Sequence, residues 1–319
     1  METPWLSVIV PSHNGERWLG TALNSVAEQT EPGIEVIVVD GSDDDHSPEI
    51  SKSFADKFCL RTYRRPDLRS WTAKTNFGVA EARSAHICML HQDDLWLPRR
   101  SAAVKKWVAA HPGGVMHLHP VHIIDEAGNR RGLWRCPLPA GDTPVPDRVL
   151  LERLLVQNFI SIPSPVIRRD AFLRVGGLDD ELWYTADWDL YLKLAAVGDV
   201  YYRQEPLACF RVHRNSLTVS GSGSIDAFQR QMETVLDRHS VRLAAVSQKG
   251  ADAALRVARL SVAVNAALAA ANRGKLAGLI KVVVALFGLG PAGIRRYFRD
   301  SRIVERVYPR LRARLAGGF

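Results

Sequence analysis

The sequence lacks the features that mark secreted, zinc-knuckle and dinucleotide-binding proteins. Its four cysteines, Cys59, Cys88, Cys136 and Cys209, lie far apart and form no CxxC pair. This spacing argues against a zinc knuckle or a disulfide scaffold and favours reduced thiols in the cytosol. No basic segment followed by an apolar run opens the chain, so we expect no secretion signal. No GxGxxG follows the first expected strand and no GxxxxGK[ST] occurs, which disfavours dehydrogenases and P-loop enzymes.

Long hydrophobic runs are also missing. The strongly apolar segment Leu276–Gly290 carries Lys281 and has about fifteen residues, short of the roughly 20 that a spanning helix needs. We expect a buried hairpin helix there, with a membrane-surface helix as the alternative. Most of the net charge of +8 lies in residues 295–319, which hold eight arginines and two acidic residues. The other residues are near neutral, and the 319-residue chain can bury a globular core, with about two domains expected.

Short β-branched runs alternate with helical patterns over residues 6–98. This alternation is typical of βα units around a mostly parallel sheet. The expected strands are Leu6–Val10, Glu35–Asp40, Cys59–Tyr63 and His86–Leu90, and the expected helices are Arg17–Gln29 and Trp71–Ser84. Parallel sheets of this kind bind ligands at the carboxyl ends of their strands, so the acidic residues that follow these strands indicate a site.

Residues 99–219 show a mixed pattern. The expected strands are His117–Ile124, Arg131–Trp134, Ile160–Ile167, Val200–Tyr202 and Ala208–Val212, with a hairpin turn at Asp125–Asn129. The expected helices are Arg99–Ala110, Arg148–Val156, Arg169–Val175 and Trp183–Val197. Ser220–Ser224 predicts a linker, and residues 225–319 have helical spacing. We therefore expect a domain over 1–219, with halves of about 1–98 and 99–219, and a helical region over 220–319.

Acidic residues gather at three points along the chain. They are Asp40 with Asp43, Asp44 and Asp45, then Asp93 with Asp94, then Asp187 with Asp189. Asp44 and Asp45 have an alternative role at a helix start. Asp93 and Asp94 lie between apolar runs with no lysine or arginine beside them. Because hard cations take carboxylate and phosphate oxygens, this pair predicts a Mg2+ or Mn2+ site that works on a diphosphate.

Seven segments, in order, resemble the motifs of family 2 glycosyltransferases of the GT-A fold. They are Ser7–Asn14, Glu35–Gly41, Asn76–Gly78, Leu90–Asp94, Gly176–Asp179, Asp187–Leu190 and Arg211–His213. The resemblance covers about residues 5–218 and not the helical tail. It implies a Rossmann-like, mostly parallel α/β sheet with a mixed acceptor-side half, followed by an all-α extension. It also implies inverting transfer of a sugar from a nucleotide-diphosphate donor to a hydroxyl acceptor.

The resemblance assigns a role to each matching residue. Asp187 is the expected general base, and Asp94 with His213 would hold Mn2+ or Mg2+, although a histidine alone is as often structural. The expected nucleotide-sugar contacts are Pro11, Ser12, Asn14, Asp40, Asn76 and Asp93. Departures from the family pattern occur at Gly41, His91 and Ala186, where a further acid is common.

Other residues are candidates on weaker grounds. Asn158, Trp183 and Trp188 are expected near the acceptor, with core packing as the alternative for Trp188. Trp71 and Lys74 are further candidates on the donor side.

The arginine-rich tail has two interpretations. It is either a solvated helix face or a segment attracted to an anionic membrane. We expect a cytoplasmic enzyme with peripheral membrane contact through residues 276–319 at the inner face of the cell membrane. Its partners would be a nucleotide-sugar donor and a glycan or lipid-linked acceptor in bacterial surface polysaccharide or other glycoconjugate synthesis, and not nucleic acid. The alternatives are a sugar-nucleotide pyrophosphorylase and a non-catalytic nucleotide-sugar-binding protein.

Overall fold

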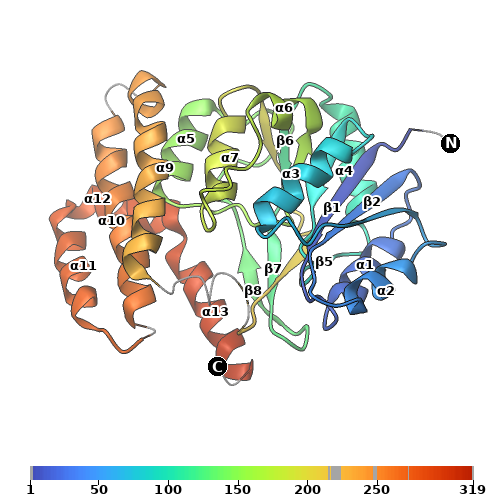
Figure 1. Cartoon of the computed structure of the whole chain (residues 1–319). Helices are drawn as coiled ribbons and strands as arrows, with labels where there is room; N and C mark the ends of the chain where they lie inside the picture. The colour runs from blue at the N-terminus through green and yellow to red at the C-terminus, as the bar shows by residue number, and fades with distance from the viewer. Residues whose placement is uncertain (1–2, 215, 217–223, 247–249, 272, 318–319) are drawn as a thin grey trace.

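Two sheets and a set of C-terminal helices build the molecule (Figure 1). The computed structural model describes residues 3–214, 216, 224–246, 250–271 and 273–317. The larger sheet runs in the order β10 (Val200–Tyr202), β6 (Met116–Leu118), β9 (Val166–Arg168), β4 (His86–Met89), β1 (Leu6–Ser12), β2 (Ile34–Asp40) and β3 (Cys59–Arg64). The smaller sheet runs in the order β5 (Leu95–Trp96), β11 (Ala208–Arg211), β7 (Val121–Ile124) and β8 (Arg130–Trp134). The expected mixed α/β fold, with a mostly parallel central sheet and C-terminal helices, is confirmed.

Helices cover both faces of the larger sheet and extend beyond it. The helices of the first two thirds are α1 (Leu19–Ala27), α2 (His46–Lys52), α3 (Trp71–Glu81), α4 (Arg100–Ala110), α5 (Asp147–Val156), α6 (Arg169–Arg174) and α7 (Ala186–Leu194). The C-terminal helices are α9 (Ile225–Val246), α10 (Ala251–Ala271), α11 (Ala277–Gly288), α12 (Gly290–Ser301) and α13 (Ile303–Gly317).

The parallel strands β1 and β2 are buried along their whole length. Side chains alternate between faces in a strand, so Val8 packs into the hydrophobic cluster that contains α1, while Ile9 packs into the cluster that contains α3. Gly78 lets α3 approach the sheet, because a Cβ atom there would lie 2.6 Å from Ile9 Cγ2. The register pairs Ser12 with Asp40, so the two strands end at the same edge.

Prolines explain where the strand predictions were wrong. The expected strand His117–Ile124 is two strands, β6 and β7, which belong to different sheets and are separated at Pro120. The expected strand Ile160–Ile167 is ordered as β9 only from Val166, because Pro163 and Pro165 have no N–H to donate to a ladder. The hairpin of β7 and β8 is confirmed.

The helical region packs on the first domain at two places. Its helices α9 and α10 pack on α5, and residues of all three belong to one hydrophobic cluster. From there α13 returns to the hairpin (Figure 1), where Pro309 packs on Gly132. The division at residues 219 and 220 stays a prediction, and the expected linker Ser220–Ser224 lies almost wholly outside the described residues.

The expectation of a buried helix over Leu276–Gly290 is wrong. No residue of α11 is buried, because its contacts are to α10 and α12 on one side only. Among the described residues, α10 is the single straight helix long and apolar enough to cross a membrane, and half of its apolar stretch is buried among other helices. Together, α11 and α12 pass the same test but are bent by 119°.

Candidate active site

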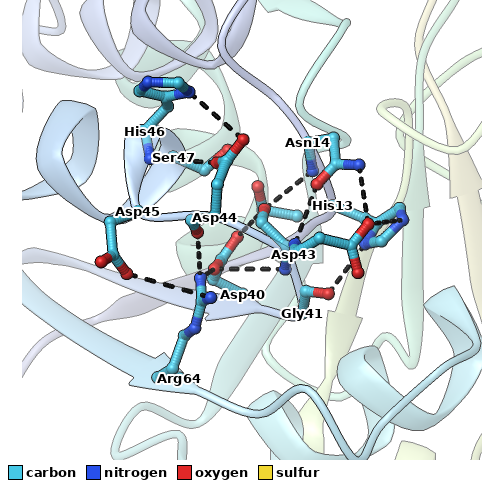
Figure 2. A network of polar contacts seen from close by, with 12 residues as sticks. His13, Asn14, Asp40, Gly41, Asp43, Asp44, Asp45, His46, Ser47 and Arg64 are labelled. Atoms are coloured by element: carbon cyan, nitrogen blue, oxygen red, sulfur yellow. Dashed lines mark hydrogen bonds and ion pairs between the residues drawn. The ribbon is translucent and has the colours of Figure 1, made fainter.

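Asp40 is the centre of a saturated polar network at the end of β2. Its buried carboxylate accepts hydrogen bonds from Ser42 Oγ at 2.6 Å and Ser42 N at 3.3 Å. Arg64 Nη1, at the end of β3, completes an ion pair with Asp40 at 2.6 Å. Figure 2 shows Arg64 reaching Asp40 and also the carbonyl of Asp44. Both carboxylate oxygens therefore have protein partners.

The loop after β1 is tied to the loop after β2. Asn14 has a left-handed backbone, φ 48°, and its side-chain amide donates to Asp43 Oδ2 at 3.1 Å. The Asp43 backbone N–H returns a bond to Asn14 Oδ1 at 3.1 Å. His13 Nδ1 lies 2.8 Å from the Gly41 carbonyl (Figure 2). Because Pro11 and Ser12 end β1 beside these loops, the structure brings the predicted residues Pro11, Ser12, Asn14 and Asp40 to one sheet edge.

Gln92 and Lys74 complete this edge. Gln92 Oε1 accepts from Ser12 Oγ at 3.1 Å and from His13 N at 2.8 Å. Lys74 is buried and packs against Gly41. A Cβ atom added to Gly41 would lie 2.9 Å from Lys74 Nζ. Burial lowers the pKa of Lys74, and the charge of Asp40 opposes that shift. The sequence marked Lys74 only as a donor-side candidate and gave no signal for Gln92.

Asp93 contacts His213, which comes from the end of β11. Asp93 Oδ2 lies 2.7 Å from His213 Nε2, and the imidazole packs on Trp18 with ring centroids 4.3 Å apart. Burial works to raise the pKa of Asp93, but the hydrogen bond from His213 and the charge of His91 outweigh it, so the pKa is below its ordinary value. With Nε2–H donating to Asp93, His213 Nδ1 keeps its lone pair. That nitrogen is buried and has no partner among the described residues.

Asp94 is buried, and its two carboxylate oxygens differ in whether they have a hydrogen-bond partner. Its side chain is 1% exposed, and Oδ1 accepts from the Arg211 backbone N–H at 2.9 Å. Asp94 Oδ2 has no hydrogen-bond partner in the described part of the chain. Burial and the neighbouring charge of Asp93 raise the pKa of Asp94 well above its ordinary value. The charge of Arg211 opposes this shift in pKa without outweighing it, and the guanidinium donates its hydrogen bonds to backbone carbonyls, including that of Asp93 at 2.8 Å.

The two unpartnered atoms are of the kinds that can bind a divalent cation. Carboxylate oxygen suits Mg2+ and Mn2+, and a ligating histidine ordinarily donates its other ring N–H to a carboxylate, as His213 does to Asp93. No group of three acidic, histidine or cysteine side chains in the described residues is arranged to hold a metal alone. The remaining ligands would therefore come from a diphosphate and water, as hard cations commonly have them.

Asp187 lies at the start of α7 with its charge only partly compensated. Its Oδ2 accepts from Asn158 Nδ2 at 2.9 Å, and its Oδ1 accepts from the Trp188 backbone N–H at 2.8 Å. Burial raises the pKa of Asp187 to about 6 despite these bonds. A carboxylate with this pKa can take a proton near neutral pH. Asp189 points elsewhere, to His239 of α9 at 3.0 Å, as expected of residues two positions apart.

The remaining predicted residues have structural contacts. Trp188 is 4% exposed and donates its indole N–H to Leu154, so the packing alternative describes it. The side chain of Asn76 bonds both backbone groups of Leu178, at 2.8 and 3.0 Å, and thereby fixes the loop before α7. The half-buried Trp183 accepts from the Trp71 indole at 3.0 Å through its carbonyl. The donor and acceptor roles of these residues stay predictions.

The mostly parallel sheet with helices on both faces resembles the architecture of GT-A glycosyltransferases. The family model described as glycosyl transferase family 2 matches residues 7–172, so the chain belongs to this family. It is 25% identical to an uncharacterized glycosyltransferase of Rickettsia typhi over 241 residues, which are 71% of this chain and 70% of the relative.

Solved structures support the fold. S. aureus TarS superposes with a TM-score of 0.60 at 18% identity, over 80% of this chain and 43% of the longer TarS chain. A shorter form of TarS in complex with UDP-GlcNAc gives a TM-score of 0.57 at 15% identity and covers 95% of this chain and 91% of that one. A Pyrobaculum calidifontis mannosyltransferase in complex with GDP-Man and Mn2+ gives a TM-score of 0.52 at 18% identity. That match covers 100% of this chain and 88% of the mannosyltransferase chain.

Proposed function

We propose that this glycosyltransferase is inverting and metal-dependent and uses a nucleotide-diphosphate sugar. The observation that carries the proposal is the unpartnered, buried Asp94 Oδ2 at a strand end whose neighbouring loops are already tied together around Asp40. A buried carboxylate oxygen without a partner is costly unless a ligand completes it. The sugar-nucleotide complexes of TarS and the mannosyltransferase support the donor class, and the Mn2+ of the latter supports the cation.

The chemistry requires a base on the acceptor side. Asp187 takes the proton of the acceptor hydroxyl while the hydroxyl oxygen bonds to the anomeric carbon and the bond from that carbon to the diphosphate oxygen breaks. Asn158 holds the Asp187 carboxylate in place at 2.9 Å. Attack from the face opposite the diphosphate inverts the anomeric centre. A divalent cation held by Asp94 and His213 would supply Lewis-acid stabilisation of the departing diphosphate.

Asp40 and its network are proposed to hold the nucleoside of the donor. The network is anchored by Arg64 and Ser42, so its geometry is set before the donor arrives. Asn14 and Ser12 line the neighbouring loop, and Asp93 fixes the His213 ring for the cation instead of meeting the donor directly. We place the reaction in surface polysaccharide or other glycoconjugate synthesis at the cytoplasmic face of the cell membrane.

Membrane contact is proposed through α11 and not through the arginines of the tail. Five apolar side chains, each at least 50% exposed, form one stripe at helical spacing: Leu276, Ile280, Val283, Val284 and Phe287. Exposed Lys275 and Lys281 flank it, a composition that suits the boundary of an anionic bilayer. Several tail arginines are instead paired within the protein, such as Arg299 with Asp300 at 2.6 Å.

The activity is tested by nucleotide-diphosphate release. The purified protein is incubated with a panel of UDP-, GDP- and other nucleotide sugars, with Mn2+, with Mg2+ and with EDTA, each with and without candidate acceptors. We expect release from at least one donor that EDTA abolishes. A pyrophosphorylase would instead form a nucleoside triphosphate when pyrophosphate is added, and a non-catalytic binding protein would bind a donor without releasing anything. Either result overturns the proposal.

The membrane contact is tested by sedimentation with vesicles. We expect binding to vesicles of 70% phosphatidylcholine and 30% phosphatidylglycerol, and its loss when Ile280, Val284 and Phe287 are all changed to serine, because the apolar contact disappears. Val241→Ser is the matched control, since Val241 is 77% exposed on α9, outside the stripe. Equal binding by the triple variant and the wild type would exclude α11 as the contact.

A further inference from the structure

Three arginines form a row along one face of α13. Arg306, Arg310 and Arg314 are spaced four residues apart, which places them on one side of the helix about 6 Å from each other. Three other arginines of the tail, Arg296, Arg299 and Arg302, have carboxylate partners; Arg302, for example, pairs with Glu305 at 2.7 Å. None of the three in the row forms an ion pair with a carboxylate of the described residues. We call Arg306, Arg310 and Arg314 the arginine row.

The charges of the arginine row are not balanced by the protein. The Nε atoms of Arg306 and Arg314 are buried and have no partner among the described residues. Among the described residues, the Arg306 guanidinium donates only to Ser301 O at 3.4 Å and Asn265 Oδ1 at 3.5 Å, both long for hydrogen bonds. Burial and the charge of Arg306 lower the pKa of Arg310 to about 9. Like charges at this spacing destabilise a helix, and partial burial adds to the cost.

The arginine row is connected to the proposed base. Asn265, which Arg306 contacts, donates to Gln157 Oε1 at 2.8 Å. The next residue, Asn158, holds Asp187. Tyr184, three residues before Asp187, lies within electrostatic reach of Arg306, Arg310 and Asp187. A series of side-chain contacts therefore links Arg306 to the helical side of the base, whereas Asp40 and Asp94 come from strand ends.

The middle of the row lies against the smaller sheet. The Arg310 guanidinium lies over Trp134 at 4.3 Å from the ring centroid and 5.8 Å from the Phe210 centroid. Arg310 also donates to the Arg306 carbonyl at 2.8 Å. The aromatic rings contact the face of the Arg310 guanidinium, and one of its N–H groups bonds to a carbonyl. None of these partners carries a negative charge. The guanidinium is thus positioned but not neutralised.

We propose that the arginine row binds the phosphate groups of a phosphate-bearing acceptor, an inference that rests on the proposed transferase function. Guanidinium groups bind phosphate oxygens in bidentate fashion. Three cations spread over about 12 Å suit a diphosphate or a run of phosphodiesters better than a single carboxylate. The acceptor is then either a soluble phosphate-containing glycan or a lipid-linked sugar, and its hydroxyl lies at Asp187.

The test compares the wild type with Arg306→Gln/Arg314→Gln and with Arg312→Gln. Arg312 is exposed on the same helix, beside Tyr308, and serves as the matched control. Inorganic pyrophosphate is titrated calorimetrically in EDTA, because the donor diphosphate site needs the cation. We expect binding to weaken at least about tenfold in the double variant and to stay unchanged in the control, since two charge-assisted contacts are lost. Where the double variant fails to fold, Arg314→Gln alone is expected to weaken binding about threefold.

A second arm separates the two acceptor sources. Vesicles of 80% phosphatidylcholine and 20% phosphatidic acid present phosphate on a lipid, and the same three proteins are sedimented with them. Dependence on Arg306 and Arg314 in the vesicle arm alone supports a lipid-linked phosphate, and dependence in the pyrophosphate arm supports a soluble one. Independence in both arms overturns the proposal. Absence in the wild type of metal-dependent nucleotide release from every donor, with and without candidate acceptors, would refute the transferase function instead.

Discussion

Asp40 and Asp94 occupy corresponding places in the sheet but have opposite surroundings. Asp40 is the last residue of β2, Asp94 lies in the segment that follows β4, and each is at most 1% exposed. Asp40 has a partner at both oxygens, from Ser42 and Arg64, all within the first 64 residues. Asp94 has one partner, a backbone N–H of Arg211, and one oxygen with none among the described residues.

The carboxylate of Asp40 is fully hydrogen-bonded within the protein, whereas that of Asp94 needs a further partner. The Asp40 network exists without a ligand, so its proposed task is to present a fixed surface to the donor. Burial and the charge of Asp93 raise the pKa of Asp94, and an added cation or a proton would satisfy its unpartnered oxygen. Asp187 is intermediate, because two hydrogen bonds hold it while its pKa stays near 6.

Replacing the intermediate carboxylate has the largest expected effect. Asp187→Asn keeps the shape and the hydrogen bond from the Trp188 backbone but cannot take a proton. We expect transfer to fall by about 100-fold to 10,000-fold, with donor binding nearly unchanged. Transfer is measured as product formation and donor binding by calorimetry with Mn2+. Exposed Asp180→Asn is the control, and wild-type turnover by Asp187→Asn would show that another residue is the base.

The next largest effect tests the comparison itself. Asp94→Asn removes the free carboxylate oxygen, so we expect the Mn2+-dependent part of nucleotide-diphosphate binding to weaken by about 10-fold to 100-fold. Asp40→Asn should weaken binding equally with Mn2+ and with EDTA, because its contacts involve no cation. Calorimetric titrations of both variants in both conditions provide the measurement. Equal cation dependence in the two variants would mean that the strand-end acids share one role.

The bounds of a strand are predicted best where its residues form one continuous apolar run. The expected strand Glu35–Asp40 is observed as Ile34–Asp40, because an apolar run covered on both faces has one stable arrangement. The run His117–Ile124 looked equally regular, but Pro120 divides it between two sheets. The hydrophobic periodicity of α11 does not indicate that its apolar segment is exposed, because its exposure depends on where α10 packs.

The positions of the acidic residues at the sheet edge were predictable from the sequence, but the residues that they contact were not. Strand ends place Asp40 and Asp94 correctly because the parallel register is a property of the whole sheet. The contacts that define their chemistry join distant segments. Asp94 meets Arg211, 117 residues later, and Asp93 meets His213, 120 residues later. No local pattern indicates such pairs, and the arginine row was hidden within a uniformly basic tail for the same reason.

The smallest expected effect is a shift of a pH profile. Asn158 donates to the charged form of Asp187 and thereby lowers its pKa, so Asn158→Ala should raise that pKa above about 6. A base must be ionised to act, so the transfer rate rises with pH through its pKa. We expect the acidic limb of kcat to move to higher pH by about one unit, since a hydrogen bond to a charged group is worth roughly 1.5 kcal/mol.

At pH well above the shifted limb, Asn158→Ala and the wild type should have the same kcat, because Asp187 is ionised in both. Asn129→Ala, in the β7–β8 hairpin, is the control for amide removal and should leave the limb in place. A loss of kcat that is equal at every pH would instead mean that Asn158 acts on the acceptor itself. The profile therefore separates a residue that positions and tunes the base from one that binds substrate.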